Sequence, residues 1–523
     1  MGEDLYELPD GWVWASLDEI TENIIDCLHS TPKFLTTGKY CIDTTCIAPG
    51  KILFNKVRYV SEQTYKERTQ RLVPQAGDIL FAREGTIGTS VVVPNNIELC
   101  LGQRMMMFRP SKCITSTYYL WALTSPAFEN QWKPKVTGTT SPHVNIRDLR
   151  IMILPLPPLP EQYRIVAKIE ELFTQLDAGV ELLKKVKAKL KRYRQAVLKA
   201  AVEGNLTKEW RTAHQGELEP ASVLLERILK QRREKWEAEQ LAKMQAQGKT
   251  PKDDSWKLKY KEPISPDTSD LPELPDGWCW ASLEELSDSL RSITYGVIKL
   301  GEHIESGVPT LRSSNVRHLK LDLNGIKKIE PELSNQYQRT ILKGGEILIT
   351  IRGTLGGIIS VSDNCAGYNI SREVAMIAPS KEILSGCYAI ILASINIQNW
   401  LFSRTKGIAY TGINLETLNQ TPVPLFSLTE QELIILEVHK NLSIIDQLEK
   451  TVDTNIKRAE KLRQSILKQA FTGQLVPQDP TDEPAEKLLE RIKAEKAQQV
   501  TTKTKKKTKS QPKSAAQLAL PLD

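Results

Sequence analysis

The stretch LPDGWVWASL at residues 8–17 recurs as LPDGWCWASL at residues 274–283, with a single substitution. Neither a turn nor a helix cap needs so long a motif, so the repeat indicates that a larger unit has been duplicated. Three further pairs of segments match in the same order: 74–93 (PQAGDILFAREGTIGTSVVV) with 342–361 (LKGGEILITIRGTLGGIISV), 137–162 with 406–431, and 195–206 (QAVLKAAVEGNL) with 464–475 (QSILKQAFTGQL). The whole chain therefore consists of two copies of one unit.

The length and charge of the chain limit its class. Its 523 residues are too many for a single hydrophobic core and suggest two to four domains, at about 100–200 residues each. Lysine and arginine number 70 against 63 acidic residues, a formal charge of +7 that permits a polyanionic partner without requiring one. No apolar run approaches the roughly 18 residues of a membrane span, and no signal-peptide pattern opens the chain. We therefore predict a cytoplasmic protein with no membrane segment.

The sequence offers no convincing catalytic or metal-binding motif. It has no G-x-x-x-x-G-K-[ST] phosphate loop, its six histidines are dispersed, and its eight cysteines form no C-x-x-C pair. Cys41 and Cys46 lie close together, but without a second pair they support a metal site only weakly. We predict that the chain has no catalytic residue and binds no metal and no cofactor.

Two glycine-rich stretches, REGTIGTS at residues 83–90 and IRGTLGGI at 351–358, each lie between two apolar runs. This pattern predicts a strand, a turn and a second strand, so we interpret both stretches as hairpin turns. The alternative is that their backbone N–H groups approach a phosphate.

Each copy has two parts with different periodicity. Short apolar runs broken by Gly, Pro and Asn predict a mixed α/β domain, and a long helical pattern follows it. A charged helix and a Pro-bounded linker join the copies. We divide the chain into globular domains at 1–155 and 271–424, long helices at 156–206 and 425–476, a charged helix and linker at 207–270, and a short helix with a basic disordered tail at 477–523.

The first long helix carries apolar or small residues at alternating steps of four and three, which is the seam of a coiled coil. Over about 36 residues such a helix is about 54 Å long. The seam consists of Ile165, Ile169, Leu172, Leu176, Gly179, Leu183, Val186, Leu190, Tyr193, Val197 and Ala200.

The second long helix repeats this seam with three amide residues in phase. Alternatively, a small rotation of the helix would bury Leu442, Ile456 and Ala470 in place of the amides. In either case a seam cannot remain in water, so we expect the two helices to pair within one chain as an antiparallel coiled coil with pseudo-two-fold symmetry. The second seam consists of Ile434, Val438, Asn441, Ile445, Leu448, Val452, Asn455, Ala459, Leu462, Ile466 and Gln469.

The framework motifs agree between the copies, whereas the interiors of the two globular domains differ. This favours one scaffold that presents two different recognition surfaces. Their loops carry basic, amide, hydroxyl and aromatic side chains that suit DNA phosphates and base edges, although a solvated surface charge is the simpler alternative for any one of them. Asn145 and Asn414 could simply cap the helices that follow them. The candidate DNA contacts are Lys56, Arg58, Arg83, Thr139, His143, Tyr295, Lys299, Arg312, Ser314, Asn315, Arg317, Arg352, Tyr410 and Thr411.

With these motifs the sequence resembles the specificity subunits of type I restriction-modification enzymes over nearly the whole chain. The resemblance rests on the paired LPDGW-W stretches, the GDILFAREGTIG and GEILITIRGTLG hairpins, the LPLPPLPEQ and PVPLFSLTEQ helix starts, and the LKAAVEGNL and LKQAFTGQL helix ends. The first domain departs from the family pattern, because STPKFLTTGKYCIDTTCI matches it only loosely and Arg83-Glu84 stands where the second domain has Ile351-Arg352.

The resemblance implies an α+β fold in which two target recognition domains bind the halves of a bipartite, asymmetric site in double-stranded DNA, while the helices fix the gap. It also implies a non-catalytic subunit that directs adenine methylation or restriction by its partners. These partners are two methyltransferase subunits, which use S-adenosylmethionine, and restriction/translocase subunits, which use ATP and Mg²⁺. The alternative is a coiled-coil scaffold with two protein-binding heads, whose affinity would be insensitive to salt. A third possibility is a sequence-specific regulator that acts alone.

Overall fold

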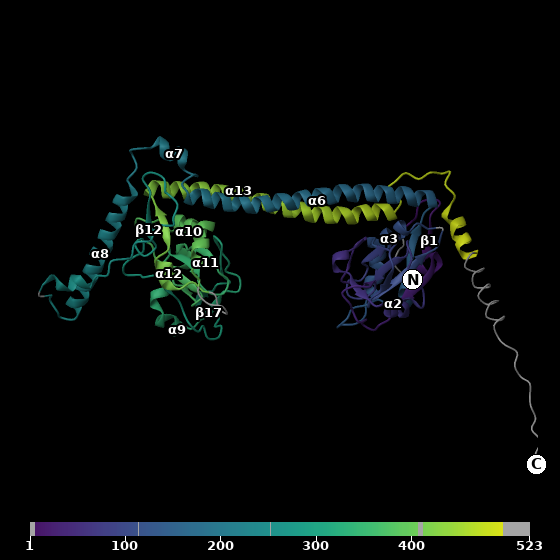
Figure 1. The fold of residues 1–523 in the computed structure, drawn as a ribbon, viewed down its shortest axis with the longest axis horizontal. Coiled ribbons are helices and arrows are strands. Elements are labelled where there is room, and N and C mark those ends of the chain that lie inside the picture. Colours follow the sequence, from purple (N-terminus) through teal and green to yellow (C-terminus); the bar gives the residue numbers. More distant parts are fainter. Residues whose placement is uncertain (1–5, 113, 252, 406–411, 495–523) are drawn as a thin grey trace, which may run out of the picture. The chain divides into compact units, whose positions relative to one another are not determined.

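The computed structural model describes residues 6–112, 114–251, 253–405 and 412–494. The chain divides into two compact units, of which unit 1 comprises Met1–Leu183 and Asp453–Asp523 and unit 2 comprises Lys184–Val452 (Figure 1). Each unit holds one globular domain and one half of each long helix. The chain beyond residue 494 and the candidate contacts Tyr410 and Thr411 lie outside the described residues.

Short strands and short helices alternate in both globular domains. Unit 1 contains β1 Val13–Ser16, α1 Leu17–Ile20, β2 Thr21–Asp26, β3 Lys39–Ile42, β4 Ile47–Ala48, β5 Lys51–Ile52, η1 Phe54–Lys56, β6 Arg58–Val60, α2 Glu62–Thr69, β7 Ile79–Ala82, β8 Ser90–Val92, β9 Leu99–Leu101, β10 Met105–Pro110, α3 Ser116–Leu123, α4 Pro126–Trp132, η2 Lys133–Lys135, α5 Ile146–Arg150 and β11 Ile153–Leu156. Unit 2 contains α7 Lys208–Ala213, α8 Ala221–Ala246, η3 Asp254–Lys259, β12 Cys279–Ser282, β13 Thr294–Tyr295, β14 Val308–Leu311, β15 Val316–Arg317, β16 Lys320–Leu321, β17 Lys327–Ile329, α9 Pro331–Gln336, η4 Gln338–Thr340, β18 Ile347–Thr350, β19 Ile358–Ser360, η5 Asp363–Cys365, β20 Asn369–Ile370, β21 Val374–Ile377, α10 Ser385–Ala393, α11 Ile395–Ser403, α12 Leu415–Asn419 and β22 Pro422–Leu425. The long helices are α6 Leu159–Val202 and α13 Leu428–Phe471.

The domain of unit 1 is built around an antiparallel four-stranded sheet in the order β2-β10-β7-β8. In β10, Met106 and Phe108 face one hydrophobic cluster, while Met105 and Met107 face another. Because side chains alternate between the two faces of a strand, this unbroken apolar run requires that both faces be covered. Helices α3 and α4 contribute to the first cluster, and strands of the three-stranded sheet β6-β3-β9 contribute to the second.

The domain of unit 2 repeats this layered arrangement. Its four-stranded sheet has the order β13-β21-β18-β19, and its three-stranded sheet has the order β17-β14-β20. In β18, Ile347 and Ile349 face the cluster that includes α10 and α11, whereas Leu348 faces the smaller sheet. The expected mixed α and β fold is therefore confirmed in both copies.

The duplicated LPDGW stretch joins each globular domain to its long helix. Strand β1 pairs antiparallel with β11, and β12 pairs in the same way with β22, directly before the helices begin. The buried tryptophan that precedes the strand then reaches the first turn of the helix. The Trp12 indole donates to Oε2 of Glu161 (3.0 Å), and the Trp278 indole donates to Oε2 of Glu430 (2.8 Å).

The glutamine that follows each of these glutamates makes a second connection. Oε1 of Gln162 accepts the backbone N–H of Thr115 before α3 (3.0 Å), and Oε1 of Gln431 accepts that of Leu384 before α10 (2.9 Å). Both glutamines are fully buried. The Glu-Gln pair in each copy therefore holds a strand and a domain helix against the start of the long helix.

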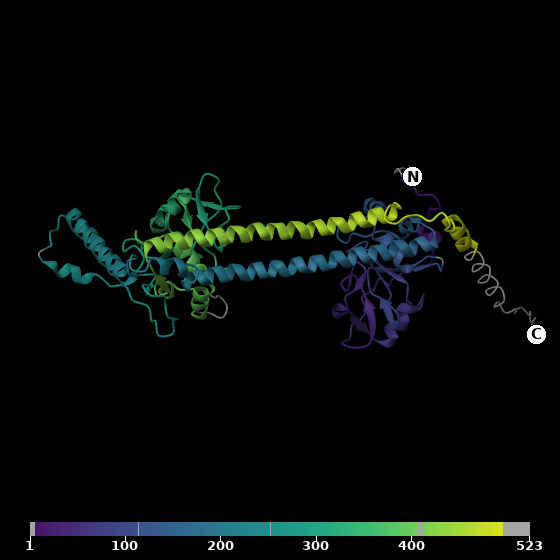
Figure 2. The same cartoon turned by 90° about the horizontal axis from the view of Figure 1, so that it is seen from above.

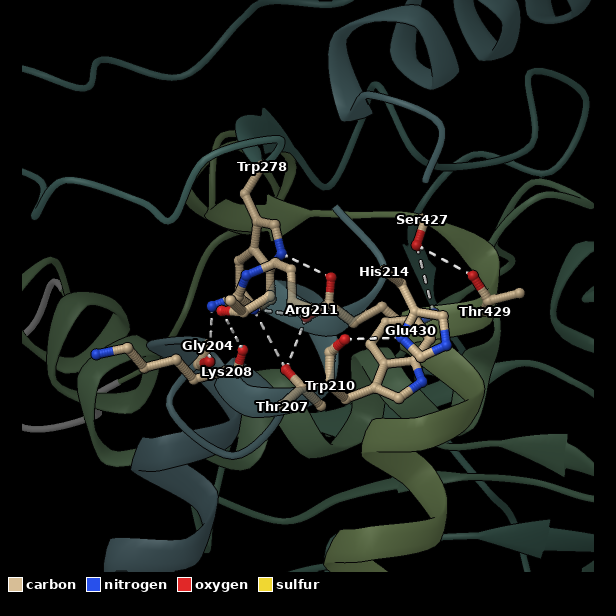
Figure 3. A network of polar contacts seen from close by, with 11 residues as sticks. Gly204, Thr207, Lys208, Trp210, Arg211, His214, Trp278, Ser427, Thr429 and Glu430 are labelled. Atoms are coloured by element: carbon tan, nitrogen blue, oxygen red, sulfur yellow. Dashed lines mark hydrogen bonds and ion pairs between the residues drawn. The ribbon is translucent and has the colours of Figure 1, made fainter. Parts of the chain in front are cut away.

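Glu430 and Glu161 differ at their second carboxylate oxygen. In unit 2, Oε1 of Glu430 accepts hydrogen bonds from Thr207 Oγ1 (2.7 Å) and Arg211 Nη1 (2.6 Å), as Figure 3 shows. In unit 1, Oε1 of Glu161 is buried, and no described residue donates to it. Burial raises the pKa of Glu161 above its ordinary value, and the indole hydrogen bond opposes this only in part.

The two long helices pack against each other in antiparallel orientation. In unit 1 the first half of α6 lies beside the second half of α13, and in unit 2 the second half of α6 lies beside the first half of α13 (Figures 1 and 2). Equivalent ion pairs bridge the helices, Arg463 with Asp177 in unit 1 and Arg194 with Asp446 in unit 2. Each helix has 44 residues and, at about 1.5 Å per residue, is about 66 Å long.

Most of the predicted seam residues are buried or half-buried, but the prediction is wrong for those that are exposed. These are Gly179, Val186, Tyr193, Leu448, Asn455, Leu462 and Gln469, with Tyr193, Leu448 and Leu462 at 51%, 46% and 48% exposure. The cause is the helix period. About ten turns of an α-helix advance a buried face by about 36 residues, whereas five heptads advance it by 35. Starting from Ile434, the buried face therefore reaches Ala470 rather than Gln469. Of the other seam positions, Ile165, Leu190, Ile445 and Val452 are buried, and Leu172, Leu176 and Leu183 are half-buried.

The rotated form of the second helix is thus the better description. Ala470 is fully buried, as that alternative predicts, and Ile456 is half-buried while Asn455 is exposed. Asn441 and Leu442 are both half-buried. Asn441 accepts a hydrogen bond from Tyr193 of α6 (3.3 Å), so at least one amide does lie at the helix pair.

A short helix docks on the duplicated stretch in each unit. In unit 2 the first turns of α8 bury Leu224 and Ile228, and the Ala221 N–H donates to Gly277 O (2.9 Å). In unit 1 the helical residues 485–494 occupy the corresponding place, with the Ala485 N–H donating to Gly11 O (2.8 Å). Both helices begin within the matching sequences EPASVLLERI and EPAEKLLERI. Unit 1 is therefore completed by residues from near both ends of the sequence.

Within the described residues, no helix combines the length and the apolar character needed to cross a membrane.

Candidate nucleic-acid interface

Three loops of unit 1 come together at one end of its four-stranded sheet. Backbone hydrogen bonds connect them, because the Arg83 N–H donates to Arg104 O (3.1 Å) and the Val144 N–H donates to Arg83 O (3.0 Å). The loops are residues 83–89 between β7 and β8, residues 102–104 between β9 and β10, and residues 137–144 before α5. We call this cluster the loop surface of unit 1.

The glycine-rich stretches form the tips of two hairpins, as the sequence predicts. Strand β7 pairs antiparallel with β8, and β18 pairs antiparallel with β19. Gly85 and Gly88 have φ values of 77° and 89°, and the equivalent Gly353 and Gly356 have 75° and 89°. Residues other than glycine rarely adopt this left-handed backbone conformation, so the tight turn of each hairpin depends on glycine at these positions.

Two of the arginines predicted from unit 1 are held by acidic side chains. Arg83 donates from Nε and Nη2 to the carboxylate of Asp26 (3.0 and 3.2 Å), and its side chain is only 9% exposed. Arg58 pairs with Asp43, and its guanidinium carbon lies 3.6 Å from the centre of the Phe34 ring. Arg83 therefore stabilises the loop surface through a buried side chain, whereas the exposed Arg58 is oriented by its contacts with Asp43 and Phe34.

The equivalent loops of unit 2 are connected in the same manner. The Ile351 N–H donates to Glu373 O (2.8 Å), and the Arg372 N–H donates to Val297 O (2.9 Å). A Cβ atom at Gly296 would lie 1.8 Å from a carbonyl oxygen of β20, so only glycine allows this approach. The loop surface of unit 2 consists of residues 295–299, 312–315, 351–357 and 371–373.

Most of the described candidate DNA contacts lie on these two surfaces. Asn315 is buried, where its Oδ1 accepts the Arg312 N–H (3.0 Å) and its amide donates to Asp322 O (2.9 Å), so it shapes its own loop. Which of the candidates touch DNA stays a prediction. Exposed are Lys56, Arg58, Thr139, Tyr295, Lys299, Ser314, Arg317 and Arg352; half-buried are His143 and Arg312; buried are Arg83 and Asn315.

Some of the candidate DNA contacts lie outside the two loop surfaces. In unit 1, Arg83, Thr139 and His143 share the loop surface, and Glu84 forms a backbone bridge with His143. Lys56 and Arg58 belong instead to the strand region of the three-stranded sheet. In unit 2, Arg317 lies on β15, beyond the loop that carries Ser314 and Asn315.

Sequence reasoning missed the loop between β9 and β10. There Arg104 has a φ of 69° and a side chain that is 51% exposed. The neighbouring Gln103 accepts a hydrogen bond from Thr31 (3.0 Å), and Arg68 donates to Leu101 O (2.9 Å). The available signal was the polar pair Gln-Arg between two apolar runs, LCL and MMMF, which is typical of a turn.

The two asparagine positions behave differently. The Asn414 side chain accepts the Thr417 N–H (2.6 Å), which confirms its role as an N-cap of α12. Asn145 occupies the N-cap position of α5, but its side chain makes no capping hydrogen bond. Among the described residues, no three or more His, Cys, Asp or Glu side chains are grouped so as to hold a metal ion.

Comparison with known proteins identifies the duplicated unit. A family model described as "Type I restriction modification DNA specificity domain" matches residues 9–192 and again residues 282–464. The specificity subunit of the type I restriction enzyme EcoBI of Escherichia coli is 31% identical over 383 residues, which cover 71% of this chain and 70% of that protein. The EcoKI specificity subunit of Escherichia coli strain K12 is 26% identical over 515 residues, 94% of this chain and 97% of that protein.

Solved structures support the same fold. A chain from a structure that describes complex assembly and conformational transition of the type I R-M system matches with a TM-score of 0.59 and 18% identity, over 90% of this chain and 100% of that chain. The crystal structure of the HsdS subunit from Thermoanaerobacter tengcongensis matches with a TM-score of 0.51 and 20% identity, over 91% and 100%.

Proposed function

Because this chain belongs to the family of type I restriction-modification DNA specificity domains, we propose that it selects the DNA sequence on which a type I restriction-modification complex acts. Each globular domain recognises one half of a bipartite site in double-stranded DNA. One observation carries the proposal: the family match occurs twice, and each matched copy gathers exposed basic and polar side chains on loops at the same end of its sheet. Such side chains suit phosphates and base edges in the major groove.

The two loop surfaces carry different residues at equivalent places, so the two half-sites differ in sequence and the whole target is asymmetric. The paired helices α6 and α13 set the gap between the half-sites. Domains that bind one face of DNA are spaced by about 34 Å or a multiple of it, and helices of about 66 Å are long enough for that role.

The chain acts through partners and performs no chemistry itself. Its relatives are named as specificity subunits of restriction enzymes, which supports a non-catalytic role. We propose two methyltransferase subunits, which bind S-adenosylmethionine and methylate adenine, and restriction/translocase subunits, which use ATP and Mg²⁺. None of these cofactors is assigned to this chain.

Binding of the full-length chain to a pool of duplexes with a randomised central stretch tests the proposal. Sequencing of the bound fraction should give two short conserved elements separated by an unspecified gap, and affinity should fall steeply as salt increases, because phosphate contacts release counterions. Affinity that does not change with salt, without any sequence preference, would instead support a scaffold with protein-binding heads.

Exchange of one domain tests its modular role. Replacing residues 293–422 with the equivalent segment of another family member should change one conserved element and leave the other intact. A change in both elements would contradict independent recognition by the two domains.

A further inference from the structure

A pair of charged residues occupies equivalent positions in the two domains. Pairing of β7 with β10 sets Ala82 opposite Met105, and pairing of β18 with β21 sets Thr350 opposite Val374. The residue two positions after the first strand is Glu84 in unit 1 and Arg352 in unit 2. The residue one position before the second strand is Arg104 in unit 1 and Glu373 in unit 2. The charges of the pair are therefore exchanged between the domains.

In unit 1 the arginine comes from the β9–β10 loop. Arg104 Nε lies 3.3 Å from Glu84 Oε1, and the Arg104 side chain is 51% exposed, against 20% for Glu84. Glu84 in turn accepts a hydrogen bond from Ser141, on the third loop of the surface. A carboxylate that is itself held by a serine thus orients an arginine at the surface, which reduces the entropy that the side chain loses on binding.

In unit 2 the arginine comes from the hairpin instead. Glu373 accepts hydrogen bonds from Ser313 Oγ (2.7 Å) and from the Ser313 N–H (3.3 Å), and Arg352 is exposed beside it. The turn glycine that follows, Gly353, lies close to the same serine, because a Cβ there would be 3.2 Å from Ser313 Oγ. As in unit 1, a serine holds the acidic member of the pair and the basic member faces solvent.

We infer that Arg104 and Arg352 are the specificity-determining residues of the two domains, each contacting a guanine in its half-site. This rests on the proposed function. An exposed guanidinium suits the two acceptors at the major-groove edge of guanine, the commonest specific contact of arginine. Glu84 orients the guanidinium of Arg104, whereas Arg352 is held beside Glu373 by its backbone N–H, which donates to Glu373 O (3.3 Å). Because the two arginines extend from opposite loops of the pair, they meet the DNA at different places, and the domains recognise different sequences on one scaffold.

Arg83 fits this role less well, although it is adjacent in sequence. The guanidinium edge formed by Nε and Nη2 already donates to both carboxylate oxygens of Asp26, and the Arg83 side chain is 9% exposed. Contact with DNA through this edge would require it to leave the half-buried Asp26 carboxylate, whose other neighbour is the exposed His29 (3.2 Å).

Selection from the randomised duplex pool with the full-length chain tests the inference. Arg104→Ala should abolish the preference for guanine at one position of one conserved element, with a loss of about 5- to 150-fold in discrimination there. The other element should be unchanged. Arg352→Ala should have the corresponding effect on the other element only.

Arg150→Ala provides a matched control. Arg150 is also a half-exposed arginine paired with one carboxylate, that of Asp18, but it lies on α5 outside the loop surface. Its replacement should leave both conserved elements as they are. The double variant Glu84→Arg/Arg104→Glu moves the arginine to the hairpin, as in unit 2, and should shift the guanine preference to a different position rather than remove it.

The outcomes separate the inference from the proposed function. If the unaltered chain shows no sequence preference, the proposed function fails. If the unaltered chain yields two conserved elements and Arg104→Ala leaves both unchanged, the inference is overturned. It is also overturned if Arg104→Ala weakens binding equally to all sequences, since that is the effect of losing a phosphate contact.

Discussion

The two units contain the same tryptophan–glutamate joint but stabilise it differently. Glu430 of unit 2 accepts hydrogen bonds from Trp278, Arg211 and Thr207, whereas Glu161 of unit 1 accepts one from Trp12 and has a buried oxygen with no described partner. Both glutamates are almost fully buried, with 1% and 2% exposure. The two copies therefore share the tryptophan–glutamate motif but differ in how many hydrogen bonds stabilise the buried carboxylate. The difference comes from the segment after α6, which supplies the arginine and the threonine only to unit 2.

A second contrast concerns how each domain packs on its helices. In unit 1, Trp121 and Phe173 pack edge to face with ring centres 5.1 Å apart, and Gly50 leaves room for the indole, since a Cβ there would lie 3.2 Å from it. In unit 2 a groove of about 1100 Å³ remains between domain and helices. The equivalent residues there are Ile390, Leu442 and Leu319, with Leu319 in the left-handed conformation that Gly50 also adopts.

The largest effect is expected for Glu430→Ala. Removing one partner of a buried ion pair leaves the other uncompensated, at a cost of about 3–5 kcal/mol, and here the Arg211 guanidinium is only 15% exposed. Hydrogen exchange at the first turns of α13 should accelerate accordingly. Glu161→Ala, which removes no such pair, should have a smaller effect on α6. Equal increases in hydrogen exchange in α13 and α6 would show that the additional partners of Glu430 do not stabilise unit 2.

Trp121→Ile should lower the stability of unit 1 by about 2–3 kcal/mol, because it deletes most of a large packed side chain. Hydrogen exchange in α3 would report the loss. Adding Gly50→Leu recreates the arrangement of unit 2 and should restore part of the stability. If Gly50→Leu lowers the stability of the Trp121→Ile variant further, a leucine at position 50 does not fill the volume that the indole leaves.

Glu161→Gln should stabilise unit 1 by about 1 kcal/mol near neutral pH, because the amide keeps an acceptor for the Trp12 indole and removes an uncompensated charge. The folded-state pKa of Glu161 lies above the value of 4.5 found when the side chain is exposed. Stability from the protonated carboxyl is therefore complete below 4.5 and is lost as the pH rises through the folded pKa.

The pH dependence distinguishes this explanation from a packing effect. Thermal unfolding of the variant and the unaltered chain should coincide at low pH and separate as the pH increases. Arg164 and Asp482, which lie near Glu161, remain the same in both proteins. A difference that stays constant over the whole pH range would show that the pKa of Glu161 is the same in the folded and unfolded states, which would contradict this explanation.

The smallest effect is expected for the equivalent arginines of the helix pair. Arg463 pairs with Asp177 and also lies over the Phe173 ring, with 4.1 Å to the ring centre, whereas Arg194 pairs with Asp446 and Glu449 and has no such ring. Arg463→Lys should cost about 0.5–1 kcal/mol through the lost stacking. Arg194→Lys should cost less, since lysine keeps the charge opposite Asp446 and Glu449 and no described aromatic ring stacks on Arg194. The free energy of unfolding in urea, measured for both variants, checks the order.

The sequence was sufficient for the duplication, the mixed domains and the paired helices, because each rests on a repeated pattern. It was insufficient where the difference between the heptad period and the α-helical period accumulates along the helix. A strict heptad predicts that Leu448 and Leu462 lie in the seam, but the helical period places them on the exposed face. The hairpin turns were predictable, since their glycines lie between apolar runs.

The sequence suggested candidate DNA contacts by chemical type, and which of them touch DNA stays a prediction. Arg83 and Asn315 were selected by chemical type, but the sequence cannot show that Asp26 and the Asp322 carbonyl already occupy their polar atoms. Arg104 was not among the candidates, because its position beside Glu84 depends on a pairing between loops that only the sheet register reveals. Side-chain type is local information, whereas exposure and bonding depend on distant residues.

Unit 1 is built from two separate segments of the chain, which has a consequence for its folding during synthesis on the ribosome. Unit 2 is one continuous segment, Lys184–Val452, whereas unit 1 joins Met1–Leu183 to residues that begin at Asp453. Domains usually fold in the order in which they emerge, at roughly 5–20 residues per second. Here the later segment can finish first, while the amino-terminal domain waits on the order of tens of seconds for α13 and the helix at 485–494. Until then, the apolar cluster of unit 1 lacks the residues that α13 and the helix at 485–494 contribute to it, among them Phe471 and Leu488.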